Sequence, residues 1–185
     1  MLGFANKIPL RTKNMISPFT LQISDLTKLG QDRAVDFFRR LLWAEATRVT
    51  IGRHLIDVPQ CVNVGDGGLD AIIADAKPLF DEVIPEATSG FQIKSGDLAP
   101  SECKKELHQE GNLKKSIKPE IKRLLDRKGT YVLALFPDIV GQKKARREEA
   151  IKRELKNLGY RRAKVRLYTA NQIAGFVERY PALVA

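Results

Sequence analysis

The sequence has few of the residues on which metal clusters, disulfide frameworks and membrane spans depend. Its 185 residues include two cysteines, Cys61 and Cys103, and two histidines, without a CxxC pair. This composition disfavours a zinc site and predicts two reduced thiols. The longest apolar runs are as short as Tyr131–Phe136, so no segment can form a transmembrane helix. Residues 1–14 lack the apolar segment of a signal peptide, and we therefore expect a cytoplasmic protein.

Positive charge is unevenly distributed along the chain, whose net charge is +10. Residues 1–100 contain 11 basic and 12 acidic side chains, whereas residues 101–185 contain 21 and 10. The excess therefore belongs to the second half, which would attract a polyanion such as nucleic acid through counterion release. The alternative is that these basic side chains lie on solvated helix faces and bind no polyanion.

The basic residues that we expect to contact nucleic acid lie on two predicted helical stretches of this second half. Those at the start of the later stretch oppose the helix dipole, which favours a phosphate contact over simple solvation. The predicted nucleic-acid-binding residues are Lys104, Lys105, Lys114, Lys115, Lys143, Lys144, Arg146 and Arg147.

The pattern of apolar residues predicts a single α/β domain. Residues 1–23 have no clear period and form an expected arm, while residues 24–185 form the domain. Its core motifs fall in 30–136, and a basic extension occupies 137–185. Helices are predicted at 24–49, 100–128 (broken around Gly111 and again near Pro119), 142–158 and 171–179. Strands are predicted at 57–64, 69–74, 90–95, 130–136 and 164–169, and residues 47–51 could begin another. The order α-β-β-β-α-β, followed by α-β-α, predicts a sandwich with a central mixed sheet in which strand 130–136 is buried on both faces.

Glu45 falls on the apolar side of the first predicted helix when successive residues are placed 100° apart. A carboxylate that faces a core is costly unless a cation, a metal ion or hydrogen-bond donors compensate it. We therefore expect Glu45 to bind a metal ion or to pair with a cation or hydrogen-bond donors. The alternative is that Glu45 reaches solvent at the frayed end of the helix's apolar side. Asp36 falls on the opposite side of the same helix.

Asp70 follows a glycine-rich turn and enters a predicted strand. Gln92 and Lys94 share one face of the next strand, because side chains alternate, and Phe91 and Ile93 point the other way. If the two strands pair as a hairpin, an acid, an amide and an ammonium group converge. Such groups can hold a hard divalent cation and stabilise the charge that develops in phosphodiester hydrolysis. The alternative is an ordinary hairpin with a polar face.

An inward helix acid, GDGGLDAII (65–73) and FQIKSGD (91–97) together resemble the Mrr-like branch of the PD-(D/E)XK nucleases over roughly residues 30–136. That family places an acid on its first helix, an Asp at the start of its second strand and (D/E/Q)xK on its third. The resemblance implies a restriction-endonuclease-like α/β/α sandwich. Carried over by position, it implies that Asp70 is the principal metal ligand, beside Gln92 and the Ile93 carbonyl, and that Lys94 is the catalytic lysine. Glu45 would be the helix acid and a further ligand, although one alignment would choose Asp36.

The function implied by the resemblance is a Mg²⁺- or Mn²⁺-dependent endonuclease that cleaves double-stranded DNA in a bacterial antiphage or restriction system. A catalytically silent nucleic-acid-binding or regulatory domain on the same fold is the alternative, and Holliday-junction resolution is a third hypothesis. Residues 167–185 resemble the junction that follows nuclease domains in large bacterial defence proteins. This implies a longer chain with a downstream ATPase or sensor module, and it leaves room for a homo-oligomer.

Overall fold

The computed structural model describes residues 21–58 and 67–184, which form an α/β fold around one five-stranded open sheet. The elements are α1 (Ile23–Thr27), α2 (Gln31–Arg48), η1 (Arg53–Leu55), β1 (Ile56–Asp57), β2 (Ala71–Ala76), β3 (Ala87–Lys94), α3 (Pro100–Lys105), η2 (Gln109–Gly111), α4 (Pro119–Asp126), β4 (Thr130–Leu135), α5 (Gly141–Asn157), β5 (Lys164–Tyr168), α6 (Ala170–Val177) and η3 (Pro181–Leu183). None of the helices in these two ranges is long and apolar enough to cross a membrane.

The sheet is mixed, as the sequence predicts. Its strands follow the order β1-β2-β3-β4-β5, with antiparallel pairing from β1 to β3 and parallel pairing from β3 to β5. The hairpin of β2 and β3 places Ala71 opposite Phe91. All six residues of β4 are buried, and this strand lies between β3 and β5. The predicted hairpin and the predicted buried strand are therefore both confirmed.

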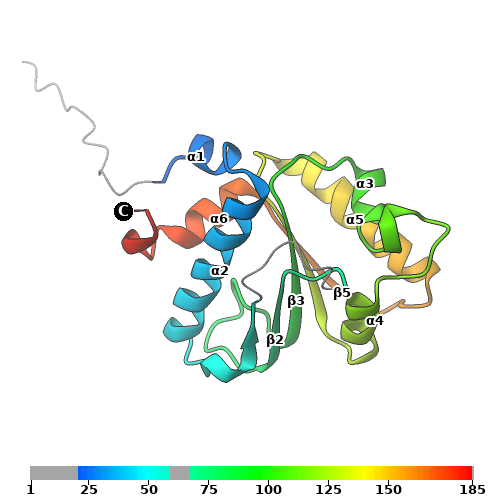
Figure 1. Ribbon diagram of the computed structural model, residues 1–185, viewed down its shortest axis with the longest axis horizontal. Helices are drawn as coiled ribbons and strands as arrows, with labels where there is room; N and C mark the ends of the chain where they lie inside the picture. The colour runs from blue at the N-terminus through cyan, green and yellow to red at the C-terminus, as the bar shows by residue number, and fades with distance from the viewer. Residues whose placement is uncertain (1–20, 59–66, 185) are drawn as a thin grey trace, which may run out of the picture.

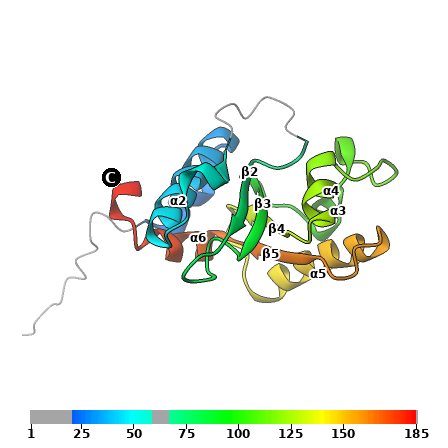
Figure 2. The same ribbon diagram turned by 90° about the horizontal axis from the view of Figure 1, so that it is seen from below.

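Helices cover both faces of the sheet (Figures 1 and 2). Helices α1, α2 and α6 lie on one side, and α3, α4 and α5 lie on the other. Phe91 and Ile93 belong to the core beneath α2, where the ring centroid of Phe91 lies 5.8 Å from that of Phe38. Tyr131 and Leu133 belong to the core beneath α3 and α4. Alternation along the strands thus fills two separate apolar layers.

The first helix differs from the sequence prediction because it is two helices. Gly30 has an extended backbone (φ −68°, ψ 166°) and forms the N-cap of α2, so α1 ends before it. By contrast, α5 ends close to Gly159, whose φ of +95° is the left-handed conformation expected of a glycine after a helix. Most of the predicted strand 57–64, most of the predicted arm and Cys61 lie outside the described residues.

Candidate functional site

Strand β3 extends beyond the point where β2 pairs with it. Two side chains form hydrogen bonds with the unpaired part of its edge. The backbone N–H of Asp70 donates to Phe91 O (2.8 Å), and the Ile93 N–H donates to Oδ2 of Asp70 (2.6 Å). Gln31, the first residue of α2, then donates from Nε2 to Ile93 O (2.7 Å) and accepts from the Ser95 N–H (3.0 Å). Asp70 and Gln31 therefore continue the hydrogen-bond ladder that β2 begins.

Gln92 and Lys94 lie on the opposite side of β3 from Phe91 and share a partner that the sequence did not indicate. Both contact Oε2 of Glu106, at 2.5 Å from Gln92 Nε2 and 3.1 Å from Lys94 Nζ. Nζ of Lys118 lies 3.4 Å from the same oxygen. One carboxylate oxygen therefore faces two ammonium groups and an amide. The prediction that Gln92 and Lys94 share one face of the strand is confirmed, and Glu106 and Lys118 lie beside them.

Tyr131 fixes the orientation of the Gln92 amide. Its hydroxyl donates to Gln92 Oε1 at 2.6 Å from a fully buried position on β4. Burial raises the pKa of Tyr131 well above its ordinary value, with a smaller contribution from the nearby Glu106, so the phenol remains a protonated donor. Since the amide nitrogen faces Glu106, the carbonyl oxygen of Gln92 points at Tyr131. The prediction that Gln92 offers this oxygen to a metal ion is not met in this arrangement.

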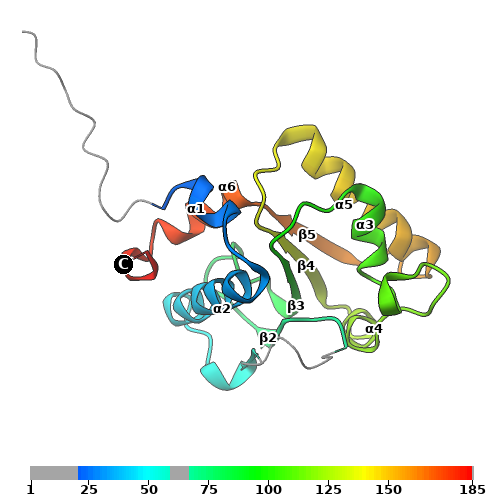
Figure 3. The same ribbon diagram turned by 45° about the horizontal axis from the view of Figure 1, so that its top comes forward.

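Gly67 and Gly68, which precede Asp70 in the chain, leave room for the start of α4. A Cβ on Gly68 (φ +104°) would lie 2.2 Å from Cδ of Lys118, and one on Gly67 (φ +67°) would lie 2.7 Å from Cγ of Glu120. Gly68 therefore lets the aliphatic part of Lys118 cross the backbone, and its left-handed conformation also favours glycine. This contact brings the Lys118 ammonium group to the Glu106 carboxylate. Helix α2, which begins at Gln31, and helix α4, whose N-cap is Lys118, lie on opposite sides of β2 and β3 (Figure 3).

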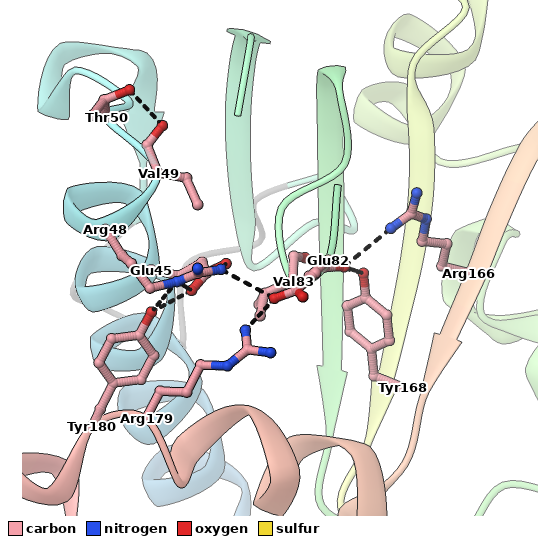
Figure 4. A network of polar contacts seen from close by, with 10 residues as sticks. All are labelled: Glu45, Arg48, Val49, Thr50, Glu82, Val83, Arg166, Tyr168, Arg179 and Tyr180. Carbon is pink, nitrogen blue, oxygen red and sulfur yellow. Dashed lines mark hydrogen bonds and ion pairs between the residues drawn. The ribbon is translucent and has the colours of Figure 1, made fainter. Parts of the chain in front are cut away.

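Glu45 is buried, as its place on the apolar stripe predicts, but the structure does not bring it to Asp70. It follows Gln31 by 14 residues in α2, which is about 21 Å of helix rise. Its carboxylate accepts from Arg48 Nη2 (2.7 Å) and Arg48 Nε (2.9 Å), and also from the hydroxyl of Tyr180 (Figure 4). The proposed helix acid is therefore already paired within the protein.

The partners of Glu45 extend into a network that joins α2, the β2–β3 loop and the C-terminal residues (Figure 4). Glu82 pairs with Arg48 at 3.1 Å and also with Arg179. Burial raises the pKa of Tyr180 to about 12, with the Glu45 hydrogen bond acting in the same direction. The β2–β3 loop is at the opposite end of this hairpin from Asp70. The network is therefore a structural connection remote from Asp70, Gln92 and Lys94.

Asp36, the other candidate helix acid, also lies outside the cluster. Its carboxylate pairs with Arg39 and, at 2.9 Å, with Arg40 on the same helix, and its side chain is 39% exposed. The α2 residue that reaches the end of β3 is instead Gln31. A helical wheel does not identify Gln31, because this residue begins the helix and its side chain points along the edge of the sheet.

Three of the predicted nucleic-acid-binding residues have side-chain partners inside the protein: Arg147, Lys144 and Lys115, which pairs with Glu110. Arg147 is 6% exposed and donates to Leu98 O (2.6 Å) and to Asp97 Oδ1 (2.7 Å), so it fastens the loop after β3 to α5. It is therefore not available for phosphate, and that prediction is wrong. Lys144 donates to Gln172 Oε1 at 2.6 Å. Lys115 is nevertheless exposed, as are Lys105, Lys114, Lys143 and Arg146, whereas Lys104 is partly buried.

His108 gives α3 a second attachment to α5. It is 1% exposed, and its ring nitrogens lie 2.8 Å from Lys115 O and 3.0 Å from Glu154 Oε1. Because His108 follows Glu106 by two residues, this attachment holds the end of α3 in place. The histidine is thus a positioning residue for the chain around the cluster.

Some of the oxygen atoms near Asp70 are suitable ligands for a magnesium ion. The Asp70 carboxylate and the Ile93 carbonyl lie on the same edge of β3, and Mg²⁺ is commonly held by one or two carboxylates together with water or phosphate oxygens. Across 21–58 and 67–184, no three His, Cys, Asp or Glu side chains are placed to hold a metal ion between them. Asp70 and Ile93 therefore remain candidate ligands because they lie on one edge, although the Ile93 carbonyl also accepts from Gln31. Gln92 and Glu45 lie away from this edge and face other partners.

No family model, curated protein or solved structure matches the chain. The candidate site is the cluster of side chains around Glu106. Its members are Asp70, Gln92, Lys94, Glu106 and Lys118, with Gln31 and Tyr131 orienting the groups around it.

Proposed function

We propose that the chain is a Mg²⁺-dependent endonuclease domain of the PD-(D/E)XK type that hydrolyses phosphodiester bonds in double-stranded DNA. The observation that carries the proposal is that Asp70 contacts the backbone of Ile93, between Gln92 and Lys94, at one end of the β2–β3 hairpin. An acid beside a backbone carbonyl and a lysine directed at an anion are the groups that phosphodiester hydrolysis needs. The restriction-endonuclease-like topology and a role in bacterial defence are part of the same proposal.

Each residue has a distinct part in the proposed reaction. The Asp70 carboxylate and the Ile93 carbonyl would hold Mg²⁺, which when bound supplies Lewis-acid stabilisation and a more acidic water. Lys94 directs its ammonium group at an anion and would stabilise the negative charge that develops on the scissile phosphate. Gln92 donates to that anion position while Tyr131 holds its amide in place. The hydrogen bond from Ile93 N–H keeps the Asp70 carboxylate at the β3 edge before substrate arrives.

A nucleic-acid-binding domain without catalysis is a second candidate, and one observation favours it. Asp70 already satisfies the backbone of Ile93, and Glu106 already pairs with Lys94, so both groups have structural partners. A protein that only binds DNA could retain them for stability. Plasmid cleavage distinguishes the two candidates.

The proposal is tested by incubating the full chain with supercoiled plasmid in MgCl₂, in MnCl₂ and in EDTA. We expect nicked and linear products with either metal and none in EDTA. Lys94→Gln should abolish these products, whereas Lys77→Gln, at an exposed lysine after β2, should leave them unchanged. RNA and branched DNA substrates, assayed in parallel, identify the substrate class. Plasmid binding without cleavage under every metal condition would favour the non-catalytic domain.

A further inference from the structure

We infer that Lys94, Lys118 and the Gln92 amide form a phosphate-binding subsite, which the carboxylate of Glu106 fills in the free protein. The inference rests on the proposed function for the source of the phosphate, which we take to be the DNA backbone. Lys118 would bind the phosphate, and the Glu106 carboxylate would compete with the phosphate for the same position.

The arrangement of donors around Glu106 is that of an anion site. Oε2 of Glu106 lies 2.5 Å from Gln92 Nε2, 3.1 Å from Lys94 Nζ and 3.4 Å from Lys118 Nζ. A phosphate oxygen accepts the same three donors, and it carries the same charge sign as the carboxylate. The side chains of Glu106 and Lys94 are 20% and 31% exposed, so solutes can reach the group.

Two of the three donors, the Gln92 amide and Lys118, are held in place by contacts that do not involve Glu106. Tyr131 orients the amide of Gln92 through a buried hydrogen bond of 2.6 Å. The stem of Lys118 crosses Gly68, and the Lys118 N–H donates to Leu107 O at 2.9 Å. Donors positioned in this way need little rearrangement when one anion replaces another. The glycine turn beside Asp70 therefore also builds the proposed phosphate subsite.

Glu106 differs from the donors in how it can move. It is the C-cap residue of the six-residue helix α3, and its carboxylate is attached through a flexible side chain. A phosphodiester carries one negative charge, so its entry in place of the carboxylate keeps the charge opposite Lys94 and Lys118 the same. Bound phosphate and the Glu106 carboxylate are then mutually exclusive at this position.

The test is calorimetric titration of the full chain with inorganic phosphate in EDTA. Because Glu106→Gln removes the competing charge and keeps the size of the side chain, it should tighten phosphate binding about tenfold or more. Adding Lys118→Gln to Glu106→Gln should abolish that gain. The matched control Glu149→Gln removes an exposed charge on α5 and should leave phosphate affinity unchanged. Unchanged affinity in Glu106→Gln, or a gain that survives Lys118→Gln, would overturn the assignment.

A second comparison does not depend on the folding of the Glu106 variant. Lys118→Gln alone should weaken phosphate binding about fivefold or more relative to the unmodified chain, since it removes one charged donor. Equal affinities would show that Lys118 does not contact phosphate. A short DNA duplex and the mononucleotide dAMP should be titrated as well. If Glu106→Gln increases the affinity for the duplex more than the affinity for dAMP, the result supports backbone phosphate as the ligand. An equal or smaller increase for the duplex overturns that source.

These measurements are independent of cleavage because they exclude metal and turnover. Tight phosphate binding in Glu106→Gln without any nuclease activity would contradict the proposed function alone. Cleavage of plasmid with unchanged phosphate affinity in Glu106→Gln would contradict the subsite alone.

Discussion

Asp70 and Ile93 are joined by a hydrogen bond of 2.6 Å from a backbone N–H to a carboxylate oxygen. The bond makes one side chain part of both the sheet and the candidate site. It places the carboxylate on the same edge as the Ile93 carbonyl, which Gln31 contacts at 2.7 Å. The position of Asp70 therefore follows from the register of β2 and β3 and does not require a bound ligand.

Gly68→Ala tests the connection between the glycine turn and Lys118. An added Cβ would lie 2.2 Å from Lys118 Cδ, so the lysine stem must move. We expect a loss of about 1–3 kcal/mol in the free energy of unfolding, together with weaker phosphate binding. Urea denaturation and phosphate calorimetry measure the two effects.

Gly111→Ala is the matched control for backbone strain. Gly111 also has a positive φ (+63°), but nothing lies within 4 Å of its added Cβ. This variant should lose stability without losing phosphate affinity. An equal loss of phosphate affinity in both variants would mean that contact with Lys118 is not the cause.

Glu45→Ala should destabilise the protein without removing its chemistry. The change leaves Arg48 without its bidentate partner and Tyr180 without an acceptor. Because Arg48 is 28% exposed, we expect a loss of about 2–3 kcal/mol, less than for a fully buried pair. Urea denaturation measures the loss, and plasmid cleavage well below the melting temperature should proceed at the unmodified rate.

Asp36→Asn provides the comparison on the same helix. Its ion pairs are partly exposed, so the free energy of unfolding should change by no more than about 0.5–1 kcal/mol. Cleavage lost in Glu45→Ala with stability intact would restore Glu45 as the helix acid.

Gln92→Glu should make stability depend on divalent metal. A carboxylate at this position cannot donate to Glu106 and would face it across 2.5 Å, the present distance from Nε2 to Oε2. In EDTA at pH 8 we expect a loss of about 1–3 kcal/mol from like-charge repulsion and the lost hydrogen bond.

Manganese should reverse much of that loss by binding between the carboxylates. Thermal melting with and without MnCl₂ should show a larger metal-induced shift in Gln92→Glu than in the unmodified chain. Gln142→Glu, at an exposed position on α5, is the charge control. A metal-induced shift equal to that of the control would show that residue 92 does not face a metal position.

Cys103 predicts a specific dependence of stability on pH. Burial raises the pKa of the Cys103 thiol to about 11, so the folded state retains a proton that the unfolded chain releases near its ordinary pKa of about 8.5. The stabilisation is fully present below pH 8.5 and is lost as the pH rises towards 11. The difference in unfolding free energy between the unmodified chain and Cys103→Ala should thus fall by about 1 kcal/mol per pH unit between pH 9 and 11. A constant difference over that range, in urea denaturation, would contradict it.

Local periodicity predicts the hairpin and the faces of its strands, because alternation is a property of neighbouring residues. It places Gln92 and Lys94 on one side and Phe91 and Ile93 on the other, as the structure has them. It does not predict Glu106, which ends a six-residue helix too short for a reliable period.

Contacts between distant segments account for the other differences. Lys118 contacts Gly68, and Tyr180 contacts Glu45, although the residues of each pair are far apart in the sequence. The helical wheel predicts that Glu45 is buried but does not identify its partner. A sequence signal for that partner exists, since Arg48 follows Glu45 by three residues on the same helix.

The most direct measurement of the central claim is the rate of Mg²⁺-dependent duplex cleavage in Asp70→Asn, with Asp75→Asn as the control. Both residues are near the ends of β2, but Asp75 is exposed and contacts Thr88. Asparagine at position 70 can still accept from the Ile93 N–H, so folding and duplex binding should remain. We predict that Asp70→Asn lowers the cleavage rate by about 100-fold or more while Asp75→Asn cleaves at the unmodified rate. Cleavage by Asp70→Asn at the unmodified rate would contradict the proposed site.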